Sequence, residues 1–256
     1  MDLGLKGKVA LVTGAGSQVG FGKSICLTLA KEGCNIVAAD INLEGAQKTA
    51  AEVETLGPKA LAVKADVTRK ADIQEAVKQA LAKFKRIDIL VNNAGAVLGH
   101  SPFLEQSEVD WDSELALNLK GAMFCCQAVL PGMVANKYGK IINISSSSAR
   151  IVHPSVSMYT IAKGALYIFT RELAKQYAGQ GIIVNSVAPG WSLTTDFVKG
   201  GPQAKERIKP MFLQECPLGR GTEPADVAGM VTYLASDLGG DIVGQIYAVD
   251  GGCTMD

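Results

Sequence analysis

The chain has 256 residues, of which 48% are hydrophobic and 20% are charged, a profile typical of a soluble globular protein with a substantial core. Basic and acidic residues are equal at 25 each, so the zero net charge excludes a general attraction to nucleic acid or to an anionic membrane. No apolar run approaches the roughly 18 residues of a transmembrane helix, and no signal-peptide pattern opens the chain, so we expect a cytoplasmic protein.

Short continuous apolar runs alternate with helical patterns along the whole chain. Such runs are typical of strands that are buried on both faces of a parallel sheet. Strands are predicted at residues 9–13, 35–40, 60–65, 88–92, 140–144, 182–188 and 245–249. Helices are predicted at about residues 22–31, 43–56, 71–84, 111–136, 157–177 and 224–235. We therefore expect an α/β fold, a single doubly wound Rossmann domain whose seven-stranded parallel sheet carries helices on both faces.

Two segments depart from this regular alternation. Pro131 lies inside the predicted helix 111–136 and should kink or shorten it, because proline removes a backbone hydrogen bond. Residues 189–220 lack periodicity, as expected of a lid or a substrate loop. No linker or repeat divides the chain, so we expect one domain over residues 1–256, with a cofactor half at about 1–145 and a catalytic and substrate half at about 146–256.

A glycine-rich turn follows the first predicted strand and opens the first helix. Glycines at such a place let backbone amides at a helix N-terminus approach a pyrophosphate closely. Many tight turns are equally rich in glycine, so the turn alone is weak evidence. It predicts dinucleotide contacts at Gly14, Ser17, Gln18, Gly20, Phe21 and Gly22.

Polar residues follow the next three strands along the same sheet edge. Asp40 ends the second strand, where a carboxylate can accept hydrogen bonds from the hydroxyls of an adenosine ribose and would repel a 2'-phosphate. No basic residue follows it, so the pattern favours NAD(H) as cofactor over NADP. Ordinary turn chemistry is the competing interpretation of these residues. Further cofactor contacts are expected at Ile41, Asp66, Val67, Asn92, Ala94 and Gly95.

Tyr159 and Lys163 are four residues apart in the predicted helix 157–177, so they project from the same face. An ammonium beside a phenol favours the phenolate, which can lower a tyrosine pKa from about 10 toward the working pH. A tyrosine tuned in this way can exchange a proton with an alcohol or carbonyl oxygen. Surface pairs with this spacing are common, so the pair gains meaning only from its surroundings.

These surroundings converge on one family. The residues that carry the resemblance are Thr13, Gly14, Gly20, Gly22, Asp66, Asn92, Asn93, Ala94, Gly95, Asn118, Ser146, Tyr159, Lys163, Asn185, Pro189, Gly190 and Thr194. In this order and spacing, they make the chain resemble the short-chain dehydrogenases/reductases over essentially its full length. The resemblance implies hydride transfer between a nicotinamide dinucleotide and a carbon that bears oxygen.

The resemblance also implies a role for each matching catalytic residue. Tyr159 is expected to be the general acid/base, and Ser146, 13 residues earlier, to hydrogen-bond the reacting oxygen. Lys163 would lower the Tyr159 pKa and bind the nicotinamide ribose, and Asn118 would hold a water in a proton relay to Lys163. Ser145, Ser147 and Ser148 compete with Ser146, which is preferred for its spacing. The nicotinamide carboxamide would lie against Pro189, Gly190, Ser192 and Thr194.

The glycine turn departs from the family pattern, because five residues instead of three separate Gly14 from Gly20. Whether Gly14 or Gly16 makes the tight first turn stays open. A longer loop resembles the divergent enoyl reductase branch, which places six residues between its tyrosine and lysine. Leu166 occupies that offset from Tyr159 here, so the spacing favours alcohol and carbonyl chemistry.

No Cys-x-x-Cys pair or zinc-ligand spacing occurs, so no metal site is predicted. The six cysteines are interpreted as small buried thiols of a reducing compartment. By resemblance, a homotetramer is expected, in which the helices 111–136 and 159–177 pair across an interface.

The substrate is less constrained than the reaction. Ser148, His153 and Trp191 are the candidate substrate contacts, with apolar neighbours at Val97, Leu98, Phe197, Met211 and Phe212. The leading hypothesis is an NAD(H)-dependent enzyme that interconverts a secondary alcohol and a ketone. One alternative is a 3-oxoacyl-thioester reductase, whose carrier or CoA phosphate could bind to Lys199, Lys205, Arg207 and Lys209. A non-catalytic dinucleotide sensor or scaffold is the alternative of another class.

Overall fold

Seven parallel strands form one sheet, in the order β3-β2-β1-β4-β5-β6-β7, so the predicted fold class is confirmed. The computed structural model describes residues 2–152, 156–193, 203, 206, 209–210 and 213–255. The strands are β1 (Val9–Thr13), β2 (Asn35–Asp40), β3 (Ala60–Lys64), β4 (Ile89–Asn92), β5 (Gly139–Ile144), β6 (Ile182–Pro189) and β7 (Ile246–Val249). Each begins and ends within one residue of its predicted range, because the apolar runs that define the strands are also the buried ones.

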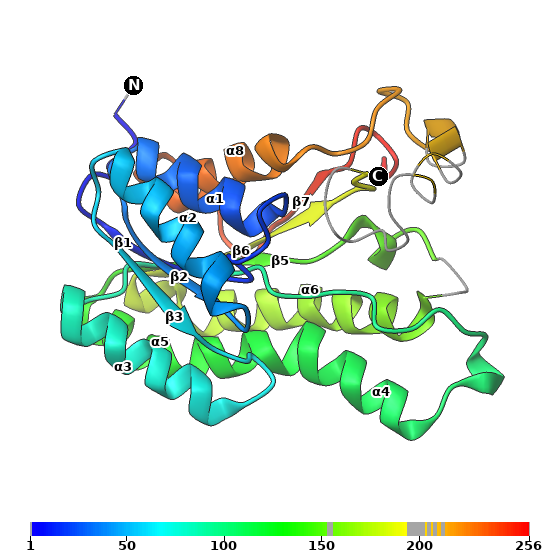
Figure 1. Ribbon diagram of the computed structural model, residues 1–256, viewed down its shortest axis with the longest axis horizontal. Helices are drawn as coiled ribbons and strands as arrows, with labels where there is room; N and C mark the ends of the chain where they lie inside the picture. Colours follow the sequence, from blue (N-terminus) through cyan, green and yellow to red (C-terminus); the bar gives the residue numbers. More distant parts are fainter. Residues whose placement is uncertain are drawn as a thin grey trace.

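Helices cover both faces of this sheet. Figure 1 shows α1, α2 and α8 on one face, and α3, α5 and α6 on the other. The α-helices are α1 (Phe21–Lys31), α2 (Leu43–Thr55), α3 (Lys70–Phe84), α4 (Glu108–Leu115), α5 (Gly121–Asn136), α6 (Ser157–Tyr177) and α8 (Pro224–Ala235). The short helical turns are η1 (Phe103–Glu105), η2 (Ala116–Lys120), η3 (Ser147–Ala149), η5 (Ala178–Gln180) and η6 (Asp237–Gly239).

The sheet separates two hydrophobic cores. Ile25, Leu29 and Val231 belong to the core under α1 and α8, and Val77 and Met133 to the core under α3 and α5. Burying one side chain of this size stabilises the fold by about 1.5–3 kcal/mol. The central strands are buried on both sides, which is why they read as continuous apolar runs.

The predicted helix 111–136 is longer than expected and includes a wider turn. It begins at Glu108, because Ser107 and Asp110 form a capping box, and it continues through the π-helical turn η2 into α5. The prediction that Pro131 shortens this helix is wrong, since α5 continues past the proline to Asn136. Burial of α5 side chains on both sides of the proline outweighs the lost hydrogen bond.

Residues Glu108–Asn136 together are long and apolar enough to cross a membrane by length and composition alone. Figure 1 shows this segment in the helical layer beside α3 and α6. Its side chains Cys125, Val129 and Met133 are buried in the core, as those of a core helix are.

The strand order reverses between β1 and β4, which lie side by side in the centre of the sheet. In open parallel sheets of this kind, the crevice at the carboxyl ends of the strands on either side of the reversal is where ligands bind. The segments that follow β1 and β4 therefore come together at this crevice.

Candidate active site

Gly14, not Gly16, makes the tight first turn after β1. Its φ of +68° lies in the left-handed region that favours glycine, whereas Gly16 has no positive φ. A methyl group at Gly22 would overlap the Gly14 carbonyl oxygen, so only glycine at position 22 allows α1 to lie this close to the turn. Gly20 caps α1 without a side-chain hydrogen bond, and the first turn of α1 has no acidic residue. This arrangement fits the pyrophosphate of a dinucleotide.

The lengthened loop contacts α2 through Gln18. The Gln18 amide nitrogen donates to the carbonyl oxygens of Gly16 (3.0 Å) and Gly45 (3.1 Å). The Gln18 amide oxygen accepts a hydrogen bond from Lys23 Nζ at 3.0 Å, and Lys23 pairs with Glu52 at 2.6 Å. Gln18 thus holds the loop in place with its side chain, and its predicted contact with the cofactor stays a prediction.

Asp40 lies at the carboxyl end of β2, as predicted, and it also braces the lengthened loop. Its Oδ2 accepts a hydrogen bond from the Gly16 amide at 2.7 Å, and its Oδ1 accepts one from the Asn42 amide at 2.8 Å. Each carboxylate oxygen keeps a second lone pair for a ribose hydroxyl. Ile41, the next residue, is 61% exposed and adds no charge.

The contacts predicted after β3 divide between a turn and the core. Asp66 Oδ1 accepts hydrogen bonds from the amide (2.9 Å) and hydroxyl (2.7 Å) of Thr68, so it fixes the turn before α3. The Val67 side chain packs on Gly121 at the start of α5. The Val67 side chain is buried, and its predicted contact with the cofactor stays a prediction.

The two asparagines after β4 face in different directions. Asn92 turns into the protein, where its amide nitrogen donates to Asn143 Oδ1 of β5 at 2.8 Å. The pairing of β4 with β5 places the Asn92 side chain beside Asn143, and a cofactor contact by Asn92 stays a prediction that its backbone would have to fulfil. Asn93 instead reaches the glycine turn and donates to the carbonyl oxygens of Thr13 (2.8 Å) and Gly14 (3.1 Å).

Gly95 stands where the two halves of the site meet. A Cβ atom at this position would lie 2.8 Å from Asn118 Oδ1 and 2.9 Å from Lys163 Nζ. Both side chains therefore converge on the backbone just after β4. The Asn118 amide nitrogen donates to the Ala96 carbonyl oxygen at 2.9 Å, which fixes the orientation of its oxygen toward Gly95. Asn118 lies within the π-helical turn η2, and such turns are frequent at functional sites.

Ser146 is the serine that meets Tyr159. The two hydroxyls are hydrogen-bonded, and this bond lowers the Tyr159 pKa. The competing serines have other partners. Ser145 Oγ contacts Ser186 Oγ at 2.6 Å within the sheet, and Ser148 Oγ donates to Ser146 Oγ at 2.9 Å. Ser148 is buried and supports Ser146, and its predicted contact with substrate stays a prediction.

Burial dominates the acid–base properties of Tyr159. It raises the Tyr159 pKa to about 12, and the hydrogen bond from Ser146 offsets this only in part. The negative charge of Glu114 raises the pKa further. The expectation of a pKa lowered by Lys163 is therefore wrong for the protein groups by themselves.

Lys163 is buried beneath the tyrosine. Its Nζ donates to the Ile144 carbonyl oxygen at 2.9 Å and lies 5.7 Å from the centre of the Tyr159 ring. Burial lowers the Lys163 pKa to about 8, while the charge of Glu114 raises it. A lysine with this pKa is only partly charged under mildly alkaline conditions, which weakens its pull on the tyrosine proton.

The segment after β6 completes the edge of the site. The Gly190 amide donates to the Val249 carbonyl oxygen at 3.0 Å, and Ser192 is buried. The Trp191 indole nitrogen donates to Glu215 Oε2 at 3.3 Å, so the ring is tied to the far end of the same predicted loop, residues 189–220. His153 and Thr194, together with Phe197, Met211 and Phe212, lie outside the described residues.

Comparison with known proteins agrees with this geometry. A family model described as enoyl-(acyl carrier protein) reductase matches residues 14–254. The 3-oxoacyl-[acyl-carrier-protein] reductase FabG of Thermotoga maritima is 37% identical over 98% of this chain and 99% of its own. The (2S)-[(R)-hydroxy(phenyl)methyl]succinyl-CoA dehydrogenase subunit BbsD of Thauera aromatica is 38% identical over 99% of both chains. A short-chain type dehydrogenase/reductase from Mycobacterium marinum superposes with a TM-score of 0.92 at 31% identity, covering 100% of this chain and 98% of that one.

The chain belongs to the short-chain dehydrogenases/reductases. It is therefore an oxidoreductase of a family that binds a nicotinamide dinucleotide. The cradle made by Gly14, Gly22 and Gly95 fits such a cofactor, because a side chain at any of the three positions would collide with neighbouring atoms.

Two residues of this short-chain dehydrogenase/reductase were missed at the sequence level. The Tyr167 hydroxyl donates to the Ser146 carbonyl oxygen at 2.7 Å, eight residues beyond Tyr159 on the same helix. Glu114 is buried four residues before Asn118, and its Oε2 accepts a hydrogen bond from the Asn118 amide nitrogen at 2.8 Å. The spacing of four residues on a predicted helix is the signal that could have found Glu114.

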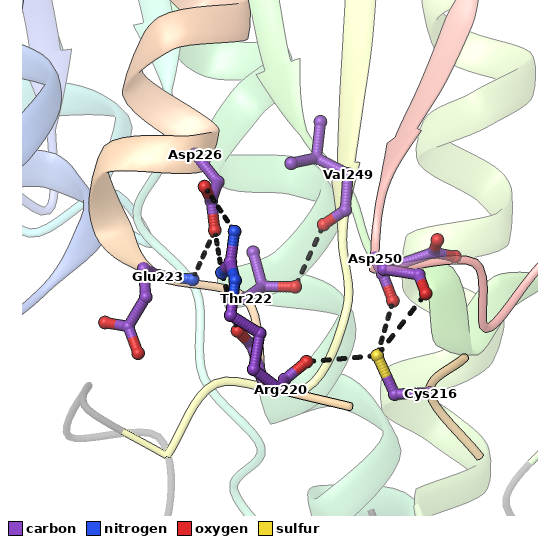
Figure 2. Close-up of polar contacts among 9 residues, drawn as sticks. Cys216, Arg220, Thr222, Glu223, Asp226, Val249 and Asp250 are labelled. Atoms are coloured by element: carbon purple, nitrogen blue, oxygen red, sulfur yellow. Dashed lines mark hydrogen bonds and ion pairs between the residues drawn. The ribbon is translucent and has the colours of Figure 1, made fainter. Parts of the chain in front are cut away.

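A cavity of about 400 Å³ in this short-chain dehydrogenase/reductase lies apart from Tyr159, between α8 and the segment after β7. Figure 2 shows how the chain around it is fastened. Cys216 Sγ donates to the Arg220 (3.0 Å) and Asp250 (3.5 Å) carbonyl oxygens, and Thr222 Oγ1 donates to the Val249 carbonyl oxygen at 3.0 Å. The far end of the predicted substrate loop is thereby anchored to the C-terminal segment.

Proposed function

We propose that this enzyme interconverts a 3-oxoacyl thioester and the corresponding 3-hydroxyacyl thioester with NAD(H). The hydrogen bond between Ser146 and Tyr159, next to the buried Lys163, is the observation that carries the reaction type. The substrate class is supported by the names of two relatives, since one describes a 3-oxoacyl group on a carrier protein and the other a hydroxyl-bearing acyl-CoA. These relatives favour the thioester over the broader expectation of a simple secondary alcohol.

In this proposal, Tyr159 and Ser146 both form hydrogen bonds to the reacting oxygen. Because its pKa is raised to about 12, Tyr159 is a phenol at neutral pH and is ready to donate its proton to a carbonyl oxygen. The Ser146 hydroxyl donates a hydrogen bond to the same oxygen and stabilises the negative charge that develops on it. Bound NADH supplies the hydride to the carbonyl carbon.

Lys163 and Asn118 provide a route by which the proton that Tyr159 loses is replaced. Lys163 Nζ and Asn118 Oδ1 both face Gly95, at 2.9 Å and 2.8 Å from the position of a Cβ there. A water between them would connect the ammonium to the amide oxygen, so a proton lost by Tyr159 can be replaced without opening the site.

Asp40 supports the preference for NAD(H). Its carboxylate is fixed at the end of β2 by the amides of Gly16 and Asn42, so it cannot swing away from a 2'-phosphate. A phosphate there would face a negative charge at short range, which is unfavourable. The exposed Ile41 offers no compensating cation.

Three intervening residues between Tyr159 and Lys163 support carbonyl reduction over the enoyl reduction named in the description of the family model. A carrier phosphate would need basic residues near the loop. Of the four that were predicted, Lys209 is described, is exposed, and pairs with Glu206 at 3.4 Å. Lys199, Lys205 and Arg207 lie outside the described residues.

A small ketone or secondary alcohol is the second candidate substrate. Val97 and Val156 form an apolar cluster with Tyr159, and this cluster suits a hydrocarbon body without a thioester. The predicted non-catalytic sensor has less support, because the residues needed for proton transfer converge in one place.

We also propose a cytoplasmic homotetramer. Met123 of α5, and Ile161 and Ile168 of α6, are large apolar side chains that are 42%, 53% and 57% exposed. Their burial between copies of the chain would remove this apolar surface from water. Phe124 and Phe169 on the same two helices pack partly against the core. Light scattering after gel filtration tests the assembly, and a monomer at micromolar concentration would contradict it.

The substrate class is tested with a panel followed by NADH absorbance. The panel contains acetoacetyl-CoA, an acetoacetyl-carrier protein, simple ketones and a 2-enoyl thioester. We expect the 3-oxoacyl thioesters to react with the highest kcat/KM. Turnover of simple ketones alone would favour the second candidate, and turnover of the enoyl thioester alone would favour enoyl reduction. No response to any compound would support the non-catalytic sensor.

A further inference from the structure

Glu114 is a buried carboxylate that the proposed mechanism does not use. It lies on α4 with 4% exposure, one helical turn before Asn118 and on the same face. Burying a carboxylate is costly unless hydrogen bonds and an opposite charge compensate. The surroundings of Glu114 supply both.

Both oxygens of Glu114 are engaged. Oε1 accepts hydrogen bonds from the backbone amides of Leu98 (2.7 Å) and Gly99 (3.3 Å), and Oε2 accepts one from the Asn118 amide nitrogen (2.8 Å). One side chain on α4 therefore ties the segment after β4 to the π-helical turn η2. Because Asn118 is held at its nitrogen, its oxygen faces Gly95, where it also accepts a hydrogen bond from the Ala96 amide at 3.2 Å.

Glu114 also acts on the two proton-transfer groups. Its charge raises the pKa of Lys163 and that of Tyr159, since a nearby negative charge favours the protonated form of each. Tyr167, which lies on α6 with Tyr159, also raises the Tyr159 pKa. Among the described residues of α4, η2, α6 and the adjoining loops, the other charged or titratable side chains that could face Glu114 are exposed to solvent, namely His100, Glu105, Glu108, Asp110, Asp112, Lys120, Arg150, Arg171, Glu172 and Lys175.

We propose that Glu114 is a positioning residue, which holds Asn118 and the segment at Leu98 and Gly99 in register and provides the buried counter-charge for Lys163. This inference rests on the proposed function, because the counter-charge matters only if Tyr159 and Lys163 transfer protons. Through Asn118 and Lys163, Glu114 affects a reaction whose atoms it does not touch.

Two variants separate the charge from the contacts. Glu114→Gln keeps the size and an acceptor for the Leu98 amide but removes the charge. Glu114→Asp keeps the charge but is too short to reach both Asn118 and the backbone of the following segment. Glu108→Gln is the matched control, because it removes an exposed carboxylate from the same helix.

The readouts are the pH profile of kcat for reduction, the dissociation constant for NADH, and Tm. For Glu114→Gln we expect kcat to fall by about tenfold or more. We also expect the alkaline limb of its profile to move down by about half a pH unit or more. Glu114→Asp should keep the limb near its original position while losing activity, and Glu108→Gln should change neither. NADH affinity should stay within about twofold in all three variants, because Glu114 lies beneath the relay and not in the glycine turn.

An alkaline limb that does not move in Glu114→Gln would overturn the counter-charge role. A loss of activity that follows Tm and is equal at every pH would show a merely structural residue. If the unaltered enzyme binds NADH but reduces nothing on the panel, the proposed function fails, whereas an active enzyme with an unshifted Glu114→Gln profile fails the inference alone.

Discussion

The hydroxyls of Ser146 and Tyr159, which lie 13 residues apart in the chain, are joined by a hydrogen bond. One hydroxyl follows β5 and the other lies in the first turn of α6, so neither helix nor strand alone could bring them together. The hydroxyl of Tyr167, which also lies on α6, donates to the Ser146 carbonyl oxygen at 2.7 Å. This bond helps to hold Ser146 beside Tyr159.

Tyr159→Phe should lower kcat by about 10²–10⁴-fold, because it removes the proton donor and little else. The ring stays in its cluster with Val97 and Val156, so the fold should be retained. NADH binding, measured by fluorescence, should stay within about twofold of the unaltered protein. Turnover at the normal rate in this variant would contradict the mechanism.

Ser146→Ala should lower kcat by about tenfold to a hundredfold, because one hydrogen bond to the developing charge is lost. Ser145→Ala is the matched control, since Ser145 Oγ bonds within the sheet to Ser186 and to the Val187 carbonyl oxygen. The control should lose stability and keep its activity. Steady-state kinetics together with thermal melts distinguish the two outcomes, and equal activity losses would disprove the special role of Ser146.

Oxidation and reduction should respond to pH in opposite directions. Oxidation needs the Tyr159 phenolate, and since the Tyr159 pKa is raised to about 12, the rate should rise by about tenfold per pH unit across the neutral range. Reduction needs the phenol and the charged Lys163, whose pKa is lowered to about 8, so its rate should fall above that pH. Initial rates in both directions between pH 6 and 10 check this. A pH-independent oxidation rate would be inconsistent with Tyr159 as the base.

Asp40→Ala should narrow the preference for NAD over NADP, because the charge that repels a 2'-phosphate is removed. It should also destabilise the protein by about 1–3 kcal/mol, because the amides of Gly16 and Asn42 lose their acceptor. Asp40→Asn keeps one acceptor oxygen and should lose less stability. The ratio of kcat/KM for the two cofactors is the measurement, and a strong NADP preference in the unaltered enzyme would refute the role of Asp40.

Gly22→Ala should weaken NADH binding and destabilise the fold by about 1–3 kcal/mol, because the added methyl group overlaps the Gly14 carbonyl oxygen. Gly229→Ala is the matched control, since a Cβ at Gly229 in α8 meets no atom within 4 Å. The control should be neutral or slightly stabilising, as alanine favours a helix over glycine. Denaturant melts and NADH titrations of both variants decide the matter, and equal effects would contradict the close packing of the turn.

The strands and α6 could be predicted from the sequence because their signals are local. Apolar runs locate each strand, and the first and last residues of α6 are Ser157 and Tyr177, as predicted. Gly14 could not be chosen over Gly16 from spacing, since the choice depends on a φ of +68° that only the folded turn reveals. The expectation that Pro131 shortens its helix was wrong, because burial of the residues around it outweighs the low helix propensity of proline.

The site was less predictable where it depends on contacts between distant segments. Asn92 faces Asn143 because β4 pairs with β5, and no sequence feature near Asn92 predicts this pairing. The direction of the Tyr159 pKa shift was wrong because the depth of burial decides it. Glu114 was within reach of the sequence, since a carboxylate four residues before Asn118 shares its helix face.

The fastening of Cys216 and Thr222 to the C-terminal segment has a practical consequence. The chain end acts as a strap, because the Gly251 carbonyl oxygen accepts a hydrogen bond from the Leu218 amide at 3.0 Å, and Asp250 accepts one from the Thr254 amide at 3.0 Å. Substitutions in residues 250–254 would therefore loosen the strap and, with it, the anchored end of the predicted substrate loop at residues 216–222.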